Sequence, residues 1–391
     1  MKLCMAVRAL PMHRPGGLEF HVWDLAGALA RRGHEVRVLT SAAPSGQMVE
    51  EWTAPPGVIV EHLPSGQAGD YSLSFWRGVA RRGEQLWREK ACDLLNMQEF
   101  AGLVCRGAAR GGAPFVVSVH GTMFTEVALD RRHWSHLSSG EKAAAIWRYK
   151  ARLALHPFFL RMVRRADLLI TDSEFTRSEL LRIDEQLDPR IRVVPLGIDP
   201  ARYGSDGRTA EVRGGALTVV MLGRVQQIKG IDTALDALAL LRGRGVKVRL
   251  LVGGGGEYLE TARRRAEKLD VAGRVEFRGR IPQEKMSAFL REGDLLLFPD
   301  LTQPAFGLVA AEAFLHGLPV MGARAGAIPE VVTEQTGWLF DPWKPTEVAG
   351  LLERLASDRD EVARKSDAAR KRFEYYTADA MAERWEQSVM R

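Results

Sequence analysis

The stretch LTVVMLGR, residues 217–224, decides the fold because it restarts a pattern that the chain has already run through once. It is a short apolar run that ends in glycine and arginine, and a helical stretch follows it. Residues 2–10, KLCMAVRAL, open the same alternation of short apolar strands and amphipathic helices near the N-terminus. Such alternation predicts parallel sheets with helices on both faces. Because the pattern restarts, we expect two α/β units.

Further apolar runs of strand length support this division. They are HEVRVLT (34–40), PFVVSVHGT (114–122) and ADLLITDS (166–173) in the first unit, and KVRLLVGGG (247–255), RVEFRGR (274–280), DLLLFPD (294–300) and LPVMGAR (318–324) in the second. Residues 195–216 are rich in glycine, proline and charge, as linkers are. We therefore expect domains at residues 1–200 and 216–375 with a linker at 201–215. Open parallel sheets bind ligands at the carboxyl ends of their strands, so we expect the substrates between the two domains.

Composition narrows the class of protein. The chain has 391 residues, too many for one ordinary core, and 27% of them are charged, as suits a water-soluble protein. It has no apolar run of about 18 residues, so no membrane-spanning helix is expected, and its first residues resemble a strand rather than a secretory signal. Cys4, Cys92 and Cys105 have neither metal-ligand spacing nor even pairing, which predicts a cytoplasmic protein.

Two segments, residues 75–90 and 121–165, are both basic and aromatic. The net charge is +6 and no nucleic-acid motif occurs, so we expect no nucleic-acid partner. The segments allow two interpretations. Their Trp, Phe and Arg side chains can make a peripheral contact with the inner face of a membrane, or the aromatic residues pack inward while the arginines are solvated.

Glycines mark two candidate sites at strand ends. Gly16 and Gly17 stand between the first strand and a helix expected over residues 19–32, where N–H groups and the helix dipole favour an anion. An ordinary strand-to-helix turn explains them as well. Gly253 begins a run of four glycines after a strand. The run lacks the G-x-G-x-x-G spacing in the first unit, so we reject a nicotinamide cofactor and retain a strand end that lines a nucleotide site.

Polar side chains at other strand ends carry the candidate chemistry. His120 follows the strand FVVSV, where it is either structural or part of the site. Arg224 and Lys229 lie on one loop after a strand. They either form a solvated basic loop or clasp a pyrophosphate, which arginine binds in a bidentate manner and lysine as a point charge.

The segment FGLVAAEAF, which begins at Phe306, predicts a turn that opens a helix. The free N–H groups of Gly307, Leu308 and Val309 can bind a phosphate. Glu312 falls in the first two turns of this helix. Its carboxylate there either accepts hydrogen bonds from two ribose hydroxyls or simply favours the helix dipole.

Asp358 and Asp360 have a spacing that occurs in metal sites. Their place at a helix start in a charged stretch favours a helix cap instead. We therefore expect no metal site.

In this order and spacing, the stretches resemble the family-4 retaining glycosyltransferases of the GT-B fold. The likeness covers nearly the whole chain. It rests on GGLEFHVWDLAGALARRGHEV (16–36), VHG (119–121), ADLLITDSEFTRSEL (166–180), RVVPLGID (192–199), GRVQQIKGID (223–232), LLVGGGGEYLE (250–260), GRIPQEKM (279–286), DLLLFPD (294–300) and FGLVAAEAFLHGLPVMGARAGAIPEVV (306–332).

The resemblance implies two Rossmann-like domains and a sugar transfer in glycan biosynthesis. The donor would be a UDP- or GDP-sugar, the acceptor a saccharide, a lipid-linked or a small molecule, and the anomeric configuration would be retained. The nucleotide sugar is a co-substrate, and no cofactor or metal is implied. The C-terminal domain would hold the nucleotide and the N-terminal domain the acceptor. The last helix, residues 376–391, would cross back to the N-terminal domain.

Roles for the candidate residues follow from the same resemblance. His120 would contact the donor sugar, and Gly16 and Gly17 would lie at the reaction centre. Arg224 and Lys229 would bind the diphosphate and stabilise it as it leaves. The other candidates that would line the donor are Gly253, Ile281 beside the base, Phe306, Gly307, Leu308 and Val309.

One departure from the family pattern concerns position 304. The family has two glutamates eight positions apart. The second matches Glu312, which would hold the ribose, and the first, which would contact the donor sugar, is replaced by Pro304. Proline has no side-chain acceptor and no N–H. Three interpretations follow: Gln303 or Asp300 substitutes, the donor differs from the common hexoses, or the chain is a non-catalytic or weakly active nucleotide-sugar-binding protein.

Overall fold

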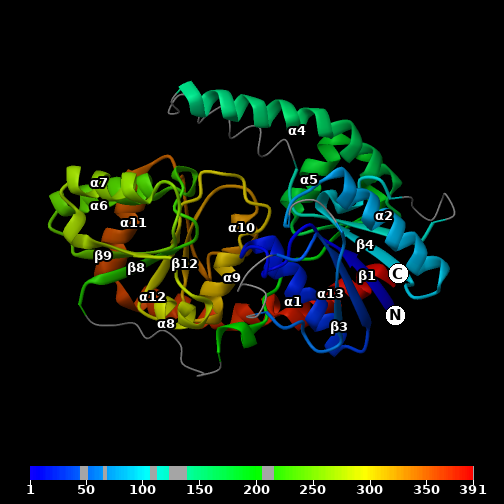
Figure 1. The fold of residues 1–391 in the computed structure, drawn as a ribbon. Helices are drawn as coiled ribbons and strands as arrows, with labels where there is room; N and C mark the ends of the chain where they lie inside the picture. Colours follow the sequence, from blue (N-terminus) through cyan, green and yellow to red (C-terminus); the bar gives the residue numbers. More distant parts are fainter. Residues whose placement is uncertain (45–51, 65–67, 106–111, 123–138, 205–214, 391) are drawn as a thin grey trace. The chain divides into compact units, whose positions relative to one another are not determined.

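The computed structural model describes residues 1–390 apart from 45–51, 65–67, 106–111, 123–138 and 205–214 (Figure 1). The chain forms two compact units. The first contains Met1–Ile198 and Ala378–Arg391, and the second contains Asp199–Thr377. The expected linker at 201–215 therefore begins inside the second unit, and its residues 205–214 lie outside the described residues.

The first unit is built on a seven-stranded sheet whose neighbouring strands are all parallel, in the order β3-β2-β1-β4-β5-β6-β7. The strands are β1 (Lys2–Ala6), β2 (Glu35–Thr40), β3 (Val58–His62), β4 (Leu94–Gln98), β5 (Phe115–Val119), β6 (Leu168–Thr171) and β7 (Ile191–Val193). The order reverses between β1 and β4, as in a doubly wound sheet. The loops after these strands therefore meet where such sheets bind ligands.

Helices cover the two faces of this sheet (Figure 1). They are α1 (Gly17–Arg31), α2 (Leu73–Arg88), α4 (Ser139–Arg165), α5 (Glu174–Ile183) and α13 (Ala378–Val389), with 3₁₀ turns at Glu99–Gly102 and Glu185–Arg190. Helix α1 begins at Gly17, two residues earlier than expected. Gly17 is therefore part of the helix, and Gly16 is the N-cap residue.

The second unit repeats the plan with a six-stranded parallel sheet in the order β10-β9-β8-β11-β12-β13. Its strands are β8 (Leu217–Leu222), β9 (Val248–Gly253), β10 (Val275–Gly279), β11 (Leu295–Phe298), β12 (Val320–Ala323) and β13 (Gly337–Phe340). Its helices are α6 (Ile231–Gly243), α7 (Leu259–Lys268), α8 (Met286–Leu290), α9 (Leu308–Leu315), α10 (Ile328–Val331), α11 (Pro345–Ser357) and α12 (Arg359–Phe373). The prediction of an α/β fold with two Rossmann-like parallel sheets is confirmed.

The basic-aromatic helix α2 packs its apolar side chains inward. Phe75, Val79 and Leu86 are buried at helical spacing and belong to the core under the first sheet. Trp76 and Trp87 pack against the same core. The packing interpretation therefore explains the aromatic residues of segment 75–90.

The second basic-aromatic segment, residues 121–165, includes residues 123–138, which lie outside the described residues. The C-terminal part of α4 buries Phe159, Met162 and Val163 in the core and leaves the neighbouring Phe158 exposed. In the described part of the chain, no helix combines the length and the apolar character that crossing a membrane requires.

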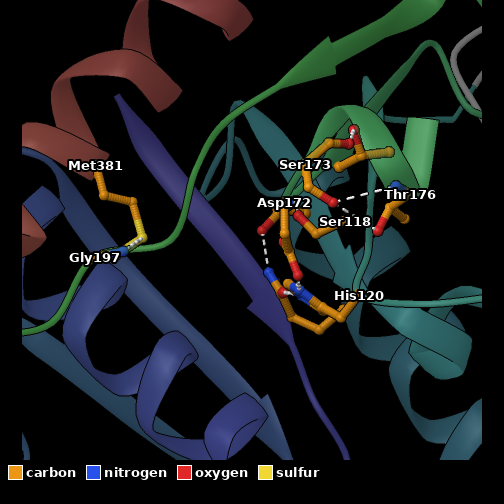
Figure 2. Close-up of polar contacts among 10 residues, drawn as sticks. Ser118, His120, Asp172, Ser173, Thr176, Gly197 and Met381 are labelled. Atoms are coloured by element: carbon orange, nitrogen blue, oxygen red, sulfur yellow. Dashed lines mark hydrogen bonds and ion pairs between the residues drawn. The ribbon is translucent and has the colours of Figure 1, made fainter. Parts of the chain in front are cut away.

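The C-terminal helix α13 belongs to the first unit. It buries Met381 and Trp385, and the N–H of Gly197 lies 3.1 Å from the Met381 sulfur (Figure 2). On its polar side, Glu386 accepts a 2.7 Å hydrogen bond from Nε of Arg32 and a second hydrogen bond from His34. These partners follow α1, so the last helix closes the first unit against the end of α1.

Replacement of Glu386 with Gln tests this attachment. The hydrogen bond from Arg32, aided by His34, lowers the pKa of Glu386 below its ordinary value of 4.5 although partial burial opposes it. Because the folded-state pKa lies below the ordinary value, the ionised carboxylate stabilises the folded protein above pH 4.5. This stabilisation is lost as the pH falls through the folded-state pKa. We expect Glu386→Gln to lower the free energy of unfolding by about 1 to 2 kcal/mol at pH 7, and the difference to shrink below pH 4.5.

Chemical denaturation at several pH values measures the effect. Asp379→Asn is the matched control, because Asp379 pairs with Arg31, the last residue of α1, but its side chain is 63% exposed, against 14% for Glu386. An equal loss in both variants, or a loss independent of pH, would contradict the assignment.

Candidate active site

The loop after β8 carries both candidate cations of the second unit. Arg224 is exposed and forms no ion pair with any described residue. Lys229 ends the 3₁₀ turn Gln227–Lys229, and its Nζ donates a 2.6 Å hydrogen bond to Oδ2 of Asp300. The side chain of Asp300 is 1% exposed, and its Oδ1 accepts hydrogen bonds from the N–H and the hydroxyl of Thr302. Lys229 is therefore held in one place while it keeps 36% exposure.

The backbone ties the same two loops together. The N–H of Leu301 donates a 2.9 Å hydrogen bond to the carbonyl of Ile228. Gly230 has φ of 76°, and a Cβ atom there would lie 1.9 Å from the carbonyl oxygen of Pro299. Only glycine fits this contact. The loop that carries Arg224 and Lys229 thus packs directly against the loop after β11.

Close backbone approach explains the glycine run after β9. A Cβ atom on Gly254 would lie 1.7 Å from the carbonyl oxygen of Gly223, and one on Gly256 would lie 2.3 Å from that of Val225. These glycines therefore let the strand end lie directly against the loop that carries Arg224.

Gly253 and Ile281 lie side by side. A Cβ atom on Gly253 would lie 2.6 Å from the ring of Phe289 and 3.0 Å from Cγ1 of Ile281. The absence of a side chain at 253 leaves room for both. The structure thus places these two candidates together at the ends of β9 and β10.

The predicted turn before a helix is present at Gly307. This residue is the N-cap of α9 and has φ of 102°, and a Cβ atom there would lie 2.8 Å from the ring of Phe298. Leu308 and Val309 open the helix, so their N–H groups have no partner within it. Phe306 is buried and its ring packs against Tyr376 at 5.7 Å, which leaves only its backbone for a ligand.

Glu312 lies in the second turn of α9 and has a partner that we did not expect from the sequence. The hydroxyl of Tyr203 donates a 2.6 Å hydrogen bond to its Oε1. Among the described residues no donor reaches Oε2. The carboxylate is thus held at one oxygen and open at the other.

The residues near Pro304 are engaged elsewhere. Oε1 of Gln303 accepts a 2.6 Å hydrogen bond from the N–H of Gly326, and the carbonyl of Pro304 accepts one of 2.8 Å from Ala327. Asp300 is occupied by Lys229 and Thr302, as described above. Neither Gln303 nor Asp300 therefore offers a free side-chain oxygen in place of the missing glutamate, which weakens the interpretation that one of them substitutes.

In the first unit, His120 lies in a buried polar network at the ends of three neighbouring strands (Figure 2). Nδ1 lies 2.9 Å from both carboxylate oxygens of Asp172, which follows β6. Nε2 lies 2.7 Å from Oε1 of Gln98, the last residue of β4. Gln98 in turn donates to Asn96, and Asn96 donates to Ser118.

Two opposed effects act on the charge of His120. Burial is the largest single effect and lowers its pKa, but the charge and hydrogen bond of Asp172, together with the charge of Glu99, outweigh burial, so the pKa of His120 lies above its ordinary value of 6.5. Both ring nitrogens face oxygen acceptors, which suits a protonated ring. Because both nitrogens are engaged inside the unit, a substrate can reach Nε2 only if Gln98 releases it.

The helix start at Gly16 already holds an anion from the chain itself. Oε2 of Glu19 would lie 2.3 Å from a Cβ atom on Gly16, and Oε1 of Glu19 accepts a 3.1 Å hydrogen bond from Arg14. Glu19 is the third residue of α1, the position from which a glutamate folds back over the N-cap. On the next turn, the ring of His21 lies 4.8 Å from that of His120. The structure thus brings this helix start and His120 into one neighbourhood.

The Asp358 side chain caps a helix. It accepts a 2.9 Å hydrogen bond from the N–H of Glu361 at the start of α12. The helix-cap prediction is confirmed for Asp358. Among the described residues, no group of three or more His, Cys, Asp or Glu side chains is arranged to hold a metal ion.

Sequence patterns of two recognised families cover most of the chain. Residues 15–202 match the family described as Glycosyltransferase Family 4, and residues 208–372 match the family described as Glycosyl transferases group 1. This chain belongs to the family-4 glycosyltransferases of the GT-B fold. The two matched ranges adjoin near the boundary between the units. Together they include the candidate residues in both units of this glycosyltransferase.

Individual relatives agree with that membership. The D-inositol 3-phosphate glycosyltransferase of Streptomyces scabiei is 28% identical over 412 residues, which cover 97% of this chain and 88% of the relative. Among solved structures, sucrose-phosphate synthase from Thermosynechococcus elongatus matches with a TM-score of 0.75 at 18% identity, over 100% of this chain and 98% of that one. Anabaena Alr3699/HepE, solved with UDP-glucose, matches with a TM-score of 0.72 at 20% identity, over 100% and 99%. At these identities, the structures show the shared fold.

Two adjacent glycines provide a matched test of how the Arg224 loop is seated. We expect Gly254→Ala to destabilise the second unit by about 2 to 4 kcal/mol and to abolish most activity, because the new Cβ atom would overlap the Gly223 carbonyl. Gly255→Ala should change stability by less than about 1 kcal/mol, because a Cβ atom at Gly255 meets nothing within 4 Å. Thermal unfolding and sugar-transfer assays of both variants measure the difference. Equal behaviour of the two variants would contradict the proposed contact.

Proposed function

We propose that this glycosyltransferase moves a sugar from a UDP- or GDP-sugar to an acceptor with retention of the anomeric configuration and without a metal ion. The observation that carries the proposal is the arrangement at the carboxyl edge of the second sheet. Lys229 is fixed by Asp300, Arg224 stands on the same loop, and α9 presents free N–H groups at its start.

This arrangement suits a leaving diphosphate. Negative charge develops on the phosphate oxygens as the bond to the sugar breaks, and fixed cations and N–H dipoles stabilise such charge. Arg224 would bind two oxygens and Lys229 one. The N–H groups of Gly307, Leu308 and Val309 would receive the remaining phosphate oxygens.

With the diphosphate bound there, the ribose and the base of the donor would bind to neighbouring residues. Glu312 would accept hydrogen bonds from the ribose hydroxyls through its open Oε2. Ile281 and Gly253, which lie together at the ends of β10 and β9, would flank the base. The UDP-glucose complex of the HepE neighbour and the shared fold support a nucleotide sugar as donor.

For the chemical step, the acceptor hydroxyl would attack the anomeric carbon on the face from which the diphosphate leaves. The acceptor proton would pass to a donor phosphate oxygen, so that no protein nucleophile is needed and the configuration is retained. His120 would contact the donor sugar, and this contact requires Gln98 to release Nε2.

The acceptor would bind to the first unit, near Gly16 and Gly17. Among saccharide, lipid-linked and small-molecule acceptors, we propose to test a phosphorylated cyclitol first. The Streptomyces scabiei relative, named D-inositol 3-phosphate glycosyltransferase, supports this choice.

Incubation with UDP- and GDP-sugars, with and without D-inositol 3-phosphate and other acceptors, tests the proposal. We expect acceptor-dependent release of UDP or GDP and a product with the donor's anomeric configuration. Arg224→Ala and Lys229→Ala should each lower kcat by about 100-fold, because each removes a cation from the leaving group.

Arg249→Ala is the control for the arginine variant. Arg249 is an exposed arginine of the same unit that pairs with Glu276 on the neighbouring strand, so its loss should leave kcat unchanged. Absence of turnover with every donor and acceptor would count against the proposal, and so would equal losses in Arg224→Ala and Arg249→Ala.

Pro304 favours a second candidate, a non-catalytic or weakly active nucleotide-sugar-binding protein. In that case calorimetry would show nucleotide binding without turnover, and Pro304→Glu would create activity that the parent lacks. Normal turnover by the parent would exclude this candidate.

A further inference from the structure

The hydroxyl of Tyr203 holds the carboxylate that we assign to the ribose. It donates a 2.6 Å hydrogen bond to Oε1 of Glu312. Hydrogen bonds to an ionised carboxylate are shorter and stronger than neutral ones. Each carboxylate oxygen has two lone-pair sites, so this bond leaves Glu312 able to accept from both hydroxyls of a ribose.

Tyr203 is itself held rigidly. The residue is 3% exposed, and its ring meets that of His316 edge-on at 5.8 Å. Its carbonyl accepts a 2.5 Å hydrogen bond from the hydroxyl of Ser287 in α8. Contacts on the ring and on the backbone therefore fix the place of the hydroxyl before any ligand binds.

The local backbone reinforces this placement. Tyr203 ends the 3₁₀ turn Pro200–Tyr203, which Asp199 caps through a 3.0 Å hydrogen bond to the N–H of Ala201. Gly204 follows with φ of 72°, a conformation that favours glycine. Residues 199–204 thus form a short rigid segment that places the hydroxyl of Tyr203 beside Glu312.

The same segment reaches the loop assigned to the base. Nε2 of Gln283 donates a 3.4 Å hydrogen bond to the carbonyl of Arg202, and Gln283 lies two residues after Ile281. Residues 199–204 therefore contact both parts of the proposed nucleoside site, α9 with Glu312 and the loop after β10 with Ile281.

We propose that Tyr203 is a positioning residue for nucleoside recognition: its hydroxyl orients Glu312 toward the 2′- and 3′-hydroxyls of the ribose. This inference rests on the proposed function, because it takes Glu312 as the residue that holds the ribose. Without the hydroxyl, the Glu312 carboxylate loses its fixed orientation. A phenylalanine would keep the packing on His316 and the backbone bond to Ser287.

Tyr203→Phe therefore separates the hydroxyl from the ring. The test is calorimetric titration of the full chain with UDP and GDP, each beside its 2′,3′-dideoxy form. The wild-type protein should bind the ribonucleotide more tightly than the dideoxy form. Tyr203→Phe should weaken ribonucleotide binding by about 10-fold, the loss expected for one hydrogen bond to a charged group, and should leave dideoxynucleotide binding unchanged.

Two further variants sharpen the test. Glu312→Gln should also remove the preference for ribose, and the double variant Tyr203→Phe/Glu312→Gln should lose little more than Glu312→Gln alone, because both residues act through one carboxylate. Tyr258→Phe removes a similar hydroxyl-to-carboxylate bond, to Asp232 at 2.8 Å. It should leave the ratio of ribose to dideoxyribose affinity unchanged.

The outcomes separate the ribose role of Glu312 from the positioning role of Tyr203. If the wild-type protein binds both nucleotide forms equally, the ribose role of Glu312 in the proposed function fails, and the role of Tyr203 fails with it. If the wild-type protein prefers ribose and Tyr203→Phe keeps that preference, only the role of Tyr203 is overturned. Equal loss of affinity for both nucleotide forms in Tyr203→Phe would also overturn it, because that result indicates a structural effect.

Discussion

The ion pair between Lys229 and Asp300 is the interaction on which the candidate donor site depends. It joins the loop after β8 to the loop after β11, and the Leu301–Ile228 backbone hydrogen bond and the glycine contact at position 230 hold the same two loops. Asp300 is almost completely buried, so its charge needs partners, and Lys229 and Thr302 supply them. The cation is thereby placed before a substrate arrives, and no rearrangement is needed when charge develops on a leaving phosphate.

Much of the second unit could be predicted because its signals are local in the sequence. The strand endings, the turn at Gly307 and the helix that carries Glu312 follow from short-range patterns of glycine and apolar residues. The partners of these residues could not be predicted in the same way. Tyr203 lies in a stretch with the composition of a linker, and its contact with Glu312 joins residues 109 positions apart. The burial of Asp300 likewise arises from tertiary packing that no local pattern encodes.

In the first unit, the sequence predicted the positions of the candidate residues but not their chemical surroundings. Gly16, Gly17 and His120 stand where the sequence placed them, at a helix start and a strand end, but their chemistry differs from a bare anion site. Glu19 supplies a negative charge at the helix start, and Asp172 and Gln98 occupy both nitrogens of His120. Glu19 had a readable signal, since a glutamate three residues after an N-cap commonly folds back over it. Asp172 had a weaker sequence signal, because it was recognisable only as a residue directly after a strand.

In the proposed function, the carboxyl edge of the second sheet binds a nucleotide diphosphate, with the phosphates on α9 and the ribose on Glu312. The decisive measurement is a crystal structure of the full chain with UDP, and a second with GDP. We expect diphosphate oxygens on the N–H groups of Gly307, Leu308 and Val309, and ribose hydroxyls within hydrogen-bond distance of Glu312. A nucleotide bound at another edge of the fold, or a ribose out of reach of Glu312, would contradict it.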